Sequence, residues 1–194
     1  LAGAMQTPGC VLIAGTGSIC YGKNAAGEHF RCGGGGHIID DPGSGYALGR
    51  DALAAALQTE DGRLSENALH GAVMDTVGGS GIQGIFDFVY FSRRGKGDIA
   101  ALAPLVLRCA AQGDAVSLDI LRRGAAELAR LVSAVMGKLG LENGSPCALA
   151  GGLLAEDNVY RRAVCAALAP FCRPATPEHD ALFGAVQLAL AAIQ

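Results

Sequence analysis

The feature that most constrains this fold is a short apolar strand that runs directly into a glycine-containing turn. Residues 10–14 (Cys-Val-Leu-Ile-Ala) have strand character, and the turn that follows is made of Gly15, Thr16, Gly17 and Ser18. Because glycine has no Cβ, such a turn can take positive φ values and lets an oxyanion approach the backbone closely. Its successive N–H groups and the two hydroxyls can donate to that anion. The turn is therefore interpreted either as a phosphate-binding loop or as an ordinary hairpin turn.

The order of the remaining elements predicts a mixed sheet with helices on its faces. Two further strands are expected at residues 19–22 and 28–32, so that the first three strands form consecutive hairpins. The later elements expected are a helix at 46–58, broken helices from 65 to 112, a helix at 115–140, a strand at 146–150, a helix at 156–169, a short edge strand at 171–173 and a helix at 181–193. The sequence thus predicts an α/β fold with a five-stranded mixed sheet, in which three antiparallel strands are joined by αβ units, and a helical insert at 65–112.

The segment 115–140 carries the strongest helical pattern. Apolar residues recur there at alternating steps of four and three, which places them on one face that should pack on the core. They are Leu121, Ala125, Leu128, Val132, Val135 and Leu139. Asp98 and Asp114 are expected to be helix N-caps, and Gly43-Ser44-Gly45 is expected to begin the helix at 46–58.

The charge, apolar runs and cysteine content of the chain restrict the classes of molecule that it is expected to bind. The net charge is −3, and the only basic cluster, residues 92–97, is better explained as a solvated loop than as a nucleic-acid contact. No apolar run reaches the roughly 18 residues that a membrane span needs, so we expect neither nucleic acid nor a membrane as a partner. Seven cysteines without a C-x-x-C pair indicate reduced thiols and a cytoplasmic location, and no metal site is expected among the residues of the chain.

A second glycine run, residues 33–36, is followed by His37, Asp40 and Asp41. Adjacent aspartates in an extended chain point to opposite sides, so one carboxylate can face a ligand while the other caps a helix or meets solvent. A carboxylate beside bare glycine backbone suits a sugar, because it accepts hydrogen bonds from hydroxyl groups. The alternative is a surface loop with a helix-capping aspartate, and His37 is interpreted as a structural residue rather than a base.

Two glycines, Gly151 and Gly152, follow the strand predicted at 146–150. Ligands of open α/β sheets bind at the carboxyl ends of strands, so a nucleotide could pack against these glycines. A tight strand-to-helix turn explains them equally well. Residues 79–84 match the spacing of a dinucleotide-binding fingerprint, but helical residues precede them, which favours a loop inside the helical insert.

Taken in order, four short motifs resemble one known family. They are Gly-Thr-Gly-Ser at 15–18, the segment 33–46 with its glycine run and paired aspartates, Leu-Ala-Gly-Gly at 149–152 and Phe-Gly-Ala at 183–185. The chain resembles the BadF/BadG/BcrA/BcrD-type ATPases, which include N-acetylglucosamine and glucosamine kinases of the actin-like ATPase, ribonuclease H-like superfamily. The resemblance covers almost the whole chain, 1–194, and only the C-terminal lobe of a family member.

The resemblance implies a two-lobed sugar kinase with ATP and Mg²⁺ between the lobes. It makes Gly15, Thr16, Gly17 and Ser18 the phosphate-binding turn. It makes Gly34, Gly35, Gly36 and Asp41 the loop that binds an amino sugar. It makes Gly151 and Gly152 the adenosine-binding motif, followed by the connection at Gly184. Relatives usually have Trp where this chain has Gly35, and Glu where it has Pro42.

The resemblance also implies what lies outside these residues. The catalytic base is expected upstream of Leu1, with residues 1–4 resembling the helix that follows it, so that the chain alone should not catalyse phosphorylation. A homodimer is expected for the full-length protein, with 65–112 as a candidate interface. Two other functions stay open: an activator ATPase of a 2-hydroxyacyl-CoA dehydratase or benzoyl-CoA reductase, and a non-catalytic module that binds a sugar or a nucleotide.

Overall fold

The computed structural model describes residues 8–78, 81–91, 93–177, 179 and 181–191. The helix expected at 1–4, part of the break near residue 80 and the last residues of the closing helix lie outside this range. Among the described residues, no single helix has the length and apolar character needed to cross a membrane; one pair, Lys96–Ala111 and Ala115–Leu139, meets those criteria jointly but bends by 118° at its break.

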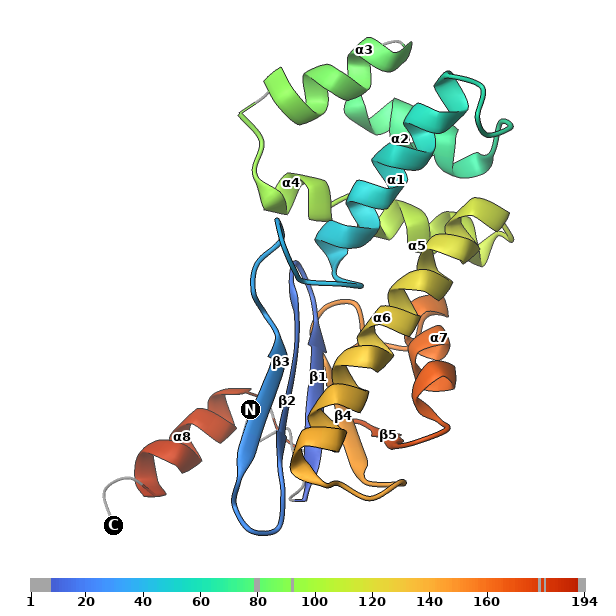
Figure 1. Cartoon of the computed structure of the whole chain (residues 1–194). Coiled ribbons are helices and arrows are strands. Elements are labelled where there is room, and N and C mark those ends of the chain that lie inside the picture. The colour runs from blue at the N-terminus through green and yellow to red at the C-terminus, as the bar shows by residue number, and fades with distance from the viewer. Residues whose placement is uncertain (1–7, 79–80, 92, 178, 180, 192–194) are drawn as a thin grey trace.

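A five-stranded mixed sheet forms the base of the molecule, in the order β3-β2-β1-β4-β5 (Figure 1). The first three strands are consecutive antiparallel hairpins, and β4 and β5 run parallel to β1, as predicted. Their bounds are Gly9–Ala14 (β1), Ser18–Lys23 (β2), His29–Gly33 (β3), Pro146–Ala150 (β4) and Arg173–Ala175 (β5).

The edge strand begins later than the predicted 171–173. The amides of Phe171 and Cys172 both donate to the carbonyl of Leu168, and so they complete the turn that follows a helix. Only from Arg173 is the backbone free to pair, and Arg173 lies opposite Pro146 of β4.

The helices form two groups around this sheet. They are α1 (Gly45–Glu60), α2 (Ala68–Val77), α3 (Gly81–Phe86) with the π-helical turn Asp87–Phe91, α4 (Lys96–Ala100), α5 (Ala103–Ala111), α6 (Ala115–Leu139), α7 (Val159–Leu168) and α8 (Ala181–Ala191). In Figure 1, α1–α5 form a tier above one end of the strands, while α6 and α7 lie to the right of the sheet and α8 to its left.

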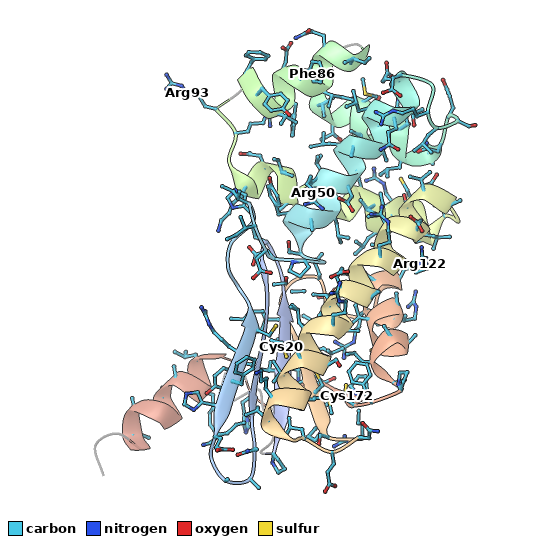
Figure 2. All side chains as sticks on the ribbon, viewed as in Figure 1. Cys20, Arg50, Phe86, Arg93, Arg122 and Cys172 are labelled. Atoms are coloured by element: carbon cyan, nitrogen blue, oxygen red, sulfur yellow. The ribbon has the colours of Figure 1, made fainter. Side chains whose placement is uncertain are left out.

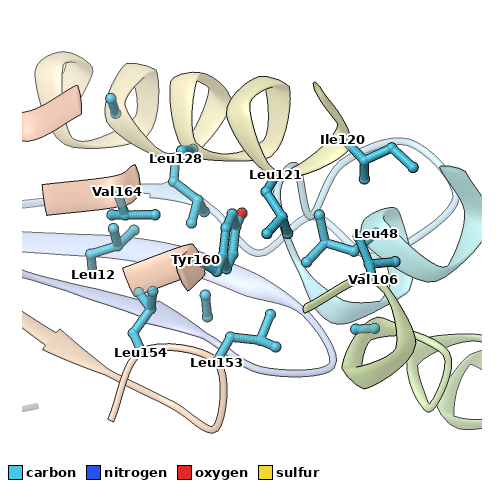
Figure 3. Packing of buried hydrophobic residues seen from close by; sticks show 14 of the residues in the cluster. Leu12, Leu48, Val106, Ile120, Leu121, Leu128, Leu153, Leu154, Tyr160 and Val164 are labelled. Atoms are coloured by element: carbon cyan, nitrogen blue, oxygen red, sulfur yellow. The ribbon is translucent and has the colours of Figure 1, made fainter. Parts of the chain in front are cut away.

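Helix α6 packs one face of the sheet, as its sequence pattern predicts. All six residues of the predicted stripe are buried. The fit is close over β2, where a Cβ on Gly22 would lie 2.5 Å from Val135 Cγ1. Figure 3 shows this core, with Tyr160 of α7 among leucines of α6, Leu12 of β1 and the leucines that follow β4.

The predicted helix starts are confirmed in two cases and wrong in one. The Asp114 carboxylate accepts the amide of Ser117 at 2.8 Å and caps α6, and Ser44 caps α1. Asp98 is not an N-cap, because α4 starts earlier, after Gly95. The Asp98 carboxylate instead reaches back from the first turn to accept the Gly95 amide at 2.8 Å.

Candidate functional site

The two glycine turns predicted to bind a nucleotide lie side by side at one edge of the sheet. The turn at 15–18 joins β1 to β2, and residues 151–152 follow β4, which runs parallel to β1. A Cβ built on Gly15 would lie 3.9 Å from the amide nitrogen of Gly152. The amide of Leu153 donates to the carbonyl of Ala14 at 3.1 Å and holds the two segments together. We call residues 15–18, 34–36, 41 and 151–152 the sheet-edge site.

Glycine is required at Gly151 for two reasons. Its φ is +90°, a left-handed value that other residues rarely adopt. A Cβ there would also collide with the backbone of Ala14. Gly152 differs, because a Cβ on it would meet nothing within 4 Å. The backbone of Gly152 is therefore open on the side where a ligand would pack.

Several backbone amides of the sheet-edge site have no acceptor among the described residues. Within the described part of the chain, the N–H groups of Thr16, Gly17 and Gly152 donate no hydrogen bond. Thr16 is exposed and Gly17 is partly so. Where such free backbone donors converge on one point, they can bind an anion such as phosphate.

Ser18 faces the loop that carries Asp41. Its hydroxyl donates to the carbonyl of Pro42 at 2.7 Å, and its amide donates to Asp41 Oδ1 at 3.2 Å. Both donors of Ser18 are thus engaged, which differs from the expected phosphate-binding hydroxyl. No local pattern in the sequence indicates these contacts, because the partners are separated by 23 and 24 residues.

Asp41 is held tightly beside the turn at 15–18. It is 6% exposed, and its φ of +55° is the only positive value of a non-glycine residue in the described chain. Its Oδ2 accepts no hydrogen bond from the described residues, while Oδ2 lies 2.9 Å from where a Cβ on Gly17 would be. One carboxylate oxygen therefore orders the loop, and the other is available to a ligand.

The glycine run 34–36 begins at the same edge, where β3 ends. Gly34 and Gly36 have positive φ values, and the amide of Gly35 donates to Asp40 Oδ2 at 2.8 Å. A Cβ on Gly35 would lie only 2.8 Å from that same oxygen. The two adjacent aspartates thus have different tasks, as predicted: Asp40 closes the glycine loop and Asp41 faces the turn at 15–18.

Further contacts around the site were not predicted. The first two amides of α1, on Gly45 and Tyr46, donate to the carbonyls of Gly15 and Thr16 at 2.7 and 3.3 Å. The ring of His37 packs edge-on against Tyr46 at 4.7 Å between centroids, a structural role that agrees with its interpretation from the sequence. Gly184 lies buried within α8, and no hydrogen bond of the described residues links it to the sheet-edge site.

A buried tyrosine is hydrogen-bonded to the loop that follows Asp41. Tyr160 Oη donates to the carbonyl of Gly43 at 2.7 Å, and the side chain is fully buried. Burial raises the pKa of Tyr160 above its ordinary value, because the phenolate would lose its hydration. Gly43 fits there because a Cβ on it would lie 2.9 Å from that phenol oxygen and 2.5 Å from the carbonyl oxygen of Gly124.

Acidic groups are sparse near these glycines. The described residues contain no group of three or more His, Cys, Asp or Glu side chains arranged to hold a metal ion. The carboxylate that contacts the turn at 15–18 is that of Asp41. A divalent cation here would therefore rely on ligand phosphates and water, with at most this one carboxylate, which is the manner in which Mg²⁺ commonly binds with nucleotides.

Comparison with known proteins identifies related sequences over most of the chain. The BadF/BadG/BcrA/BcrD ATPase family model matches residues 1–189. An N-acetylmuramic acid/N-acetylglucosamine kinase of Clostridium acetobutylicum is 36% identical over 194 residues, covering 97% of this chain and 63% of the relative. An N-acetyl-D-glucosamine kinase of Dictyostelium discoideum is 31% identical over 159 residues, covering 80% and 48%. The chain thus spans between about half and two-thirds of these relatives.

Solved structures show the same fold. A Chromobacterium violaceum protein assigned as an N-acetylglucosamine kinase superposes with a TM-score of 0.74 at 32% identity, over 93% of this chain and 59% of that one. A Porphyromonas gingivalis protein with the same assignment gives a TM-score of 0.68 at 18% identity, over 92% and 59%. The second likeness concerns the fold alone.

Proposed function

The chain belongs to the BadF/BadG/BcrA/BcrD ATPase family, and from this premise we propose that it forms one lobe of a kinase that transfers phosphate from ATP to an amino sugar such as N-acetylglucosamine. The observation that carries the proposal is the meeting of residues 15–18, 151–152 and Asp41 at one sheet edge. The kinases named among its relatives support the choice of substrate class.

Each part of the sheet-edge site has a task in this proposal. The unpaired amides of Thr16 and Gly17 hold phosphate oxygens of ATP. The turn at Gly151 places the open backbone of Gly152 where the adenosine can pack closely. The free oxygen of Asp41 accepts a hydrogen bond from a sugar hydroxyl beside the glycines at 34–36. Phosphoryl transfer is catalysed largely by such positioning and by charge stabilisation.

ATP use follows from the family, and Mg²⁺ is part of the proposal. When bound, the cation neutralises charge on the phosphates that it bridges. This chain would contribute Asp41 at most, and the backbone donors at 16–17 would fix the phosphates. No residue of the chain is assigned as catalytic base. The homodimer and the cytoplasmic location remain predictions.

Nucleotide binding by this chain is tested with Gly152→Leu. A Cβ at Gly152 would meet no protein atom within 4 Å, so the variant should fold with unchanged stability while its side chain occupies the space of the nucleotide. A non-hydrolysable ATP analogue at about 100 times its Kd should stabilise the wild type by about 2.7 kcal/mol in thermal or urea unfolding. We expect Gly152→Leu to lose this stabilisation.

The control is Gly137→Leu, on the exposed side of α6, where a Cβ also meets nothing within 4 Å. It should keep the full response to the analogue. Equal stabilisation of both variants would contradict the placement of the nucleotide at Gly152.

Turnover is tested on the complete gene product, with N-acetylglucosamine, ATP and Mg²⁺ in a coupled assay of ADP release. Asp41→Asn keeps an acceptor for the Ser18 amide but removes the charge from the sugar site. We expect kcat/KM for the sugar to fall at least tenfold, an order-of-magnitude figure for one lost charged hydrogen bond, while stabilisation by the ATP analogue is retained. Sugar binding by calorimetry without any turnover in the wild type would instead support the non-catalytic module.

A further inference from the structure

Five cysteines form a row across the sheet, on the face that α6 and α7 cover. From edge to edge they are Cys32 on β3, Cys20 on β2, Cys10 on β1, Cys147 on β4 and Cys172 next to β5. Figure 2 labels two of them, Cys20 within the sheet and Cys172 toward β5. We propose that one pair in this row, Cys20 and Cys32, is a reversible disulfide site that a peroxide oxidises.

The strand register places these two thiols opposite each other. Cys20 and Cys32 are directly paired residues of the antiparallel strands β2 and β3. Both side chains point to the α6 face, because both contact the same hydrophobic core. Paired residues in antiparallel strands have Cα atoms about 4.5 or 5.5 Å apart, within the range of about 4.4–6.8 Å that disulfides span. The Cα spacing of this strand pair therefore suits a disulfide.

Solvent exposure distinguishes Cys32 from the other four cysteines of the row. Cys10, Cys20, Cys147 and Cys172 are at most 4% exposed, whereas Cys32 is only partly buried. Cys32 also lines an open pocket of about 520 Å³ that Asp40 and residues of α6, including Glu127, Arg130 and Ser133, complete. A small oxidant can therefore reach Cys32 first, and Cys20 is the thiol directly opposite it.

The reaction balances with hydrogen peroxide as the oxidant. The Cys32 sulfur attacks one peroxide oxygen, the O–O bond breaks, and Cys32 becomes a sulfenic acid with release of one water. The Cys20 sulfur then attacks the sulfenic sulfur, the S–O bond breaks, and a second water leaves. Two thiols lose two electrons and two protons, and a dithiol reductant such as dithiothreitol reverses the change.

The second step should be the slow one. The neighbouring Cys10 thiol, together with burial, raises the pKa of Cys20 well above the ordinary value. Since the thiolate is the nucleophile in disulfide formation, the sulfenic acid on Cys32 should persist long enough to be trapped with dimedone.

The bond would lie beside two segments of the sheet-edge site, after the end of the turn at 15–18 and before the start of the glycine run at 34–36. Cys20 follows Ser18 by two residues, and Cys32 precedes Gly34 by two. Oxidation would thus fix β3, an edge strand, to β2 next to the glycine run at 34–36. This inference concerns the thiols alone and does not depend on the proposed kinase activity.

The test is peptide mapping by mass spectrometry after the folded 194-residue chain is treated with hydrogen peroxide. We expect a peptide pair linked through Cys20 and Cys32 that has lost two hydrogens and that dithiothreitol separates. Cys32→Ser should abolish the linked pair, and Cys20→Ala should leave a dimedone adduct on Cys32. The matched control is Cys165→Ser, which removes the other partly buried cysteine, located on α7, and should leave the linked pair unchanged.

Four outcomes would overturn the proposal. They are a disulfide between Cys20 and Cys10, a linked pair that persists in Cys32→Ser, sulfinic acid on Cys32 with Cys20 still reduced, and no oxidation of either thiol. Each of these is read from the masses and is independent of any result with ATP or sugar.

Discussion

At the scale of single residues, the sheet-edge site depends on where side chains are absent. Gly17 leaves room for the Asp41 carboxylate, whose three outer atoms lie 2.9–3.1 Å from the position of a Cβ on Gly17. Gly151 provides a left-handed turn against Ala14. These glycines therefore serve two different purposes: Gly17 permits contact between two segments, and Gly151 permits a backbone conformation.

Gly17→Ala tests the first purpose. The added methyl group would displace the Asp41 carboxylate and weaken its hydrogen bond with the Ser18 amide. Overpacking of this kind costs about 1–3 kcal/mol of unfolding free energy, measured by urea denaturation, and should also reduce nucleotide-dependent stabilisation. Gly137→Ala, in the exposed part of α6, should instead gain up to about 1 kcal/mol from helix propensity. A Gly17→Ala protein as stable as the wild type would show that the Asp41 contact is unimportant.

Tyr160→Phe tests the hydrogen bond between the buried Tyr160 hydroxyl and the loop at Gly43. Removing its hydroxyl leaves the Gly43 carbonyl without that donor, so we expect a loss of about 1–3 kcal/mol at neutral pH. Tyr90→Phe, at a site 73% exposed, should change stability by less than about 0.5 kcal/mol.

The raised pKa of Tyr160 also predicts a difference at high pH. Above about pH 10 this tyrosine ionises in the unfolded chain but keeps its proton in the folded one, so the unfolded state binds fewer protons. The wild type should therefore lose about 1.4 kcal/mol of stability per pH unit relative to Tyr160→Phe. Parallel pH profiles of the two proteins in urea denaturation between pH 9 and 11 would contradict the assigned burial effect.

At the scale of elements, the start of α6 also anchors the tier of helices above the sheet. One oxygen of Asp114 caps α6 through the Ser117 amide at 2.8 Å, and the other accepts the Ala68 amide at the start of α2 at 3.1 Å. The backbone amide of Asp114 donates a hydrogen bond to the carbonyl of Cys109 in α5. A single residue thus joins three helices.

Asp114→Ala should lose both side-chain contacts. A lost N-cap costs about 0.5–2 kcal/mol, so we expect a destabilisation near the upper end of that range in urea denaturation. Asp114→Asn retains one acceptor and should keep the α6 cap while losing most of the contact with Ala68. If the two variants were equally stable, the bridge to α2 would contribute nothing.

At the scale of the whole molecule, the sequence predicted what local patterns encode. The consecutive hairpins of the first three strands followed from turn signals, and the long helix followed from its apolar stripe, all of which lies in the core. The edge strand and the Asp98 cap were wrong by a few residues, because turn hydrogen bonds at 168–172 and 95–98 decide those ends. The engagement of Ser18 and the strained φ of Asp41 could not be predicted, because both arise only when distant segments meet.

The contact between α1 and the turn at 15–18 gives the tier of helices a mechanical role. Gly45 and Tyr46 donate directly to the carbonyls of Gly15 and Thr16, so a displacement of α1 would move the peptide units that carry the amides of Thr16 and Gly17. If these amides bind phosphate as proposed, such a displacement would change their position through the backbone alone.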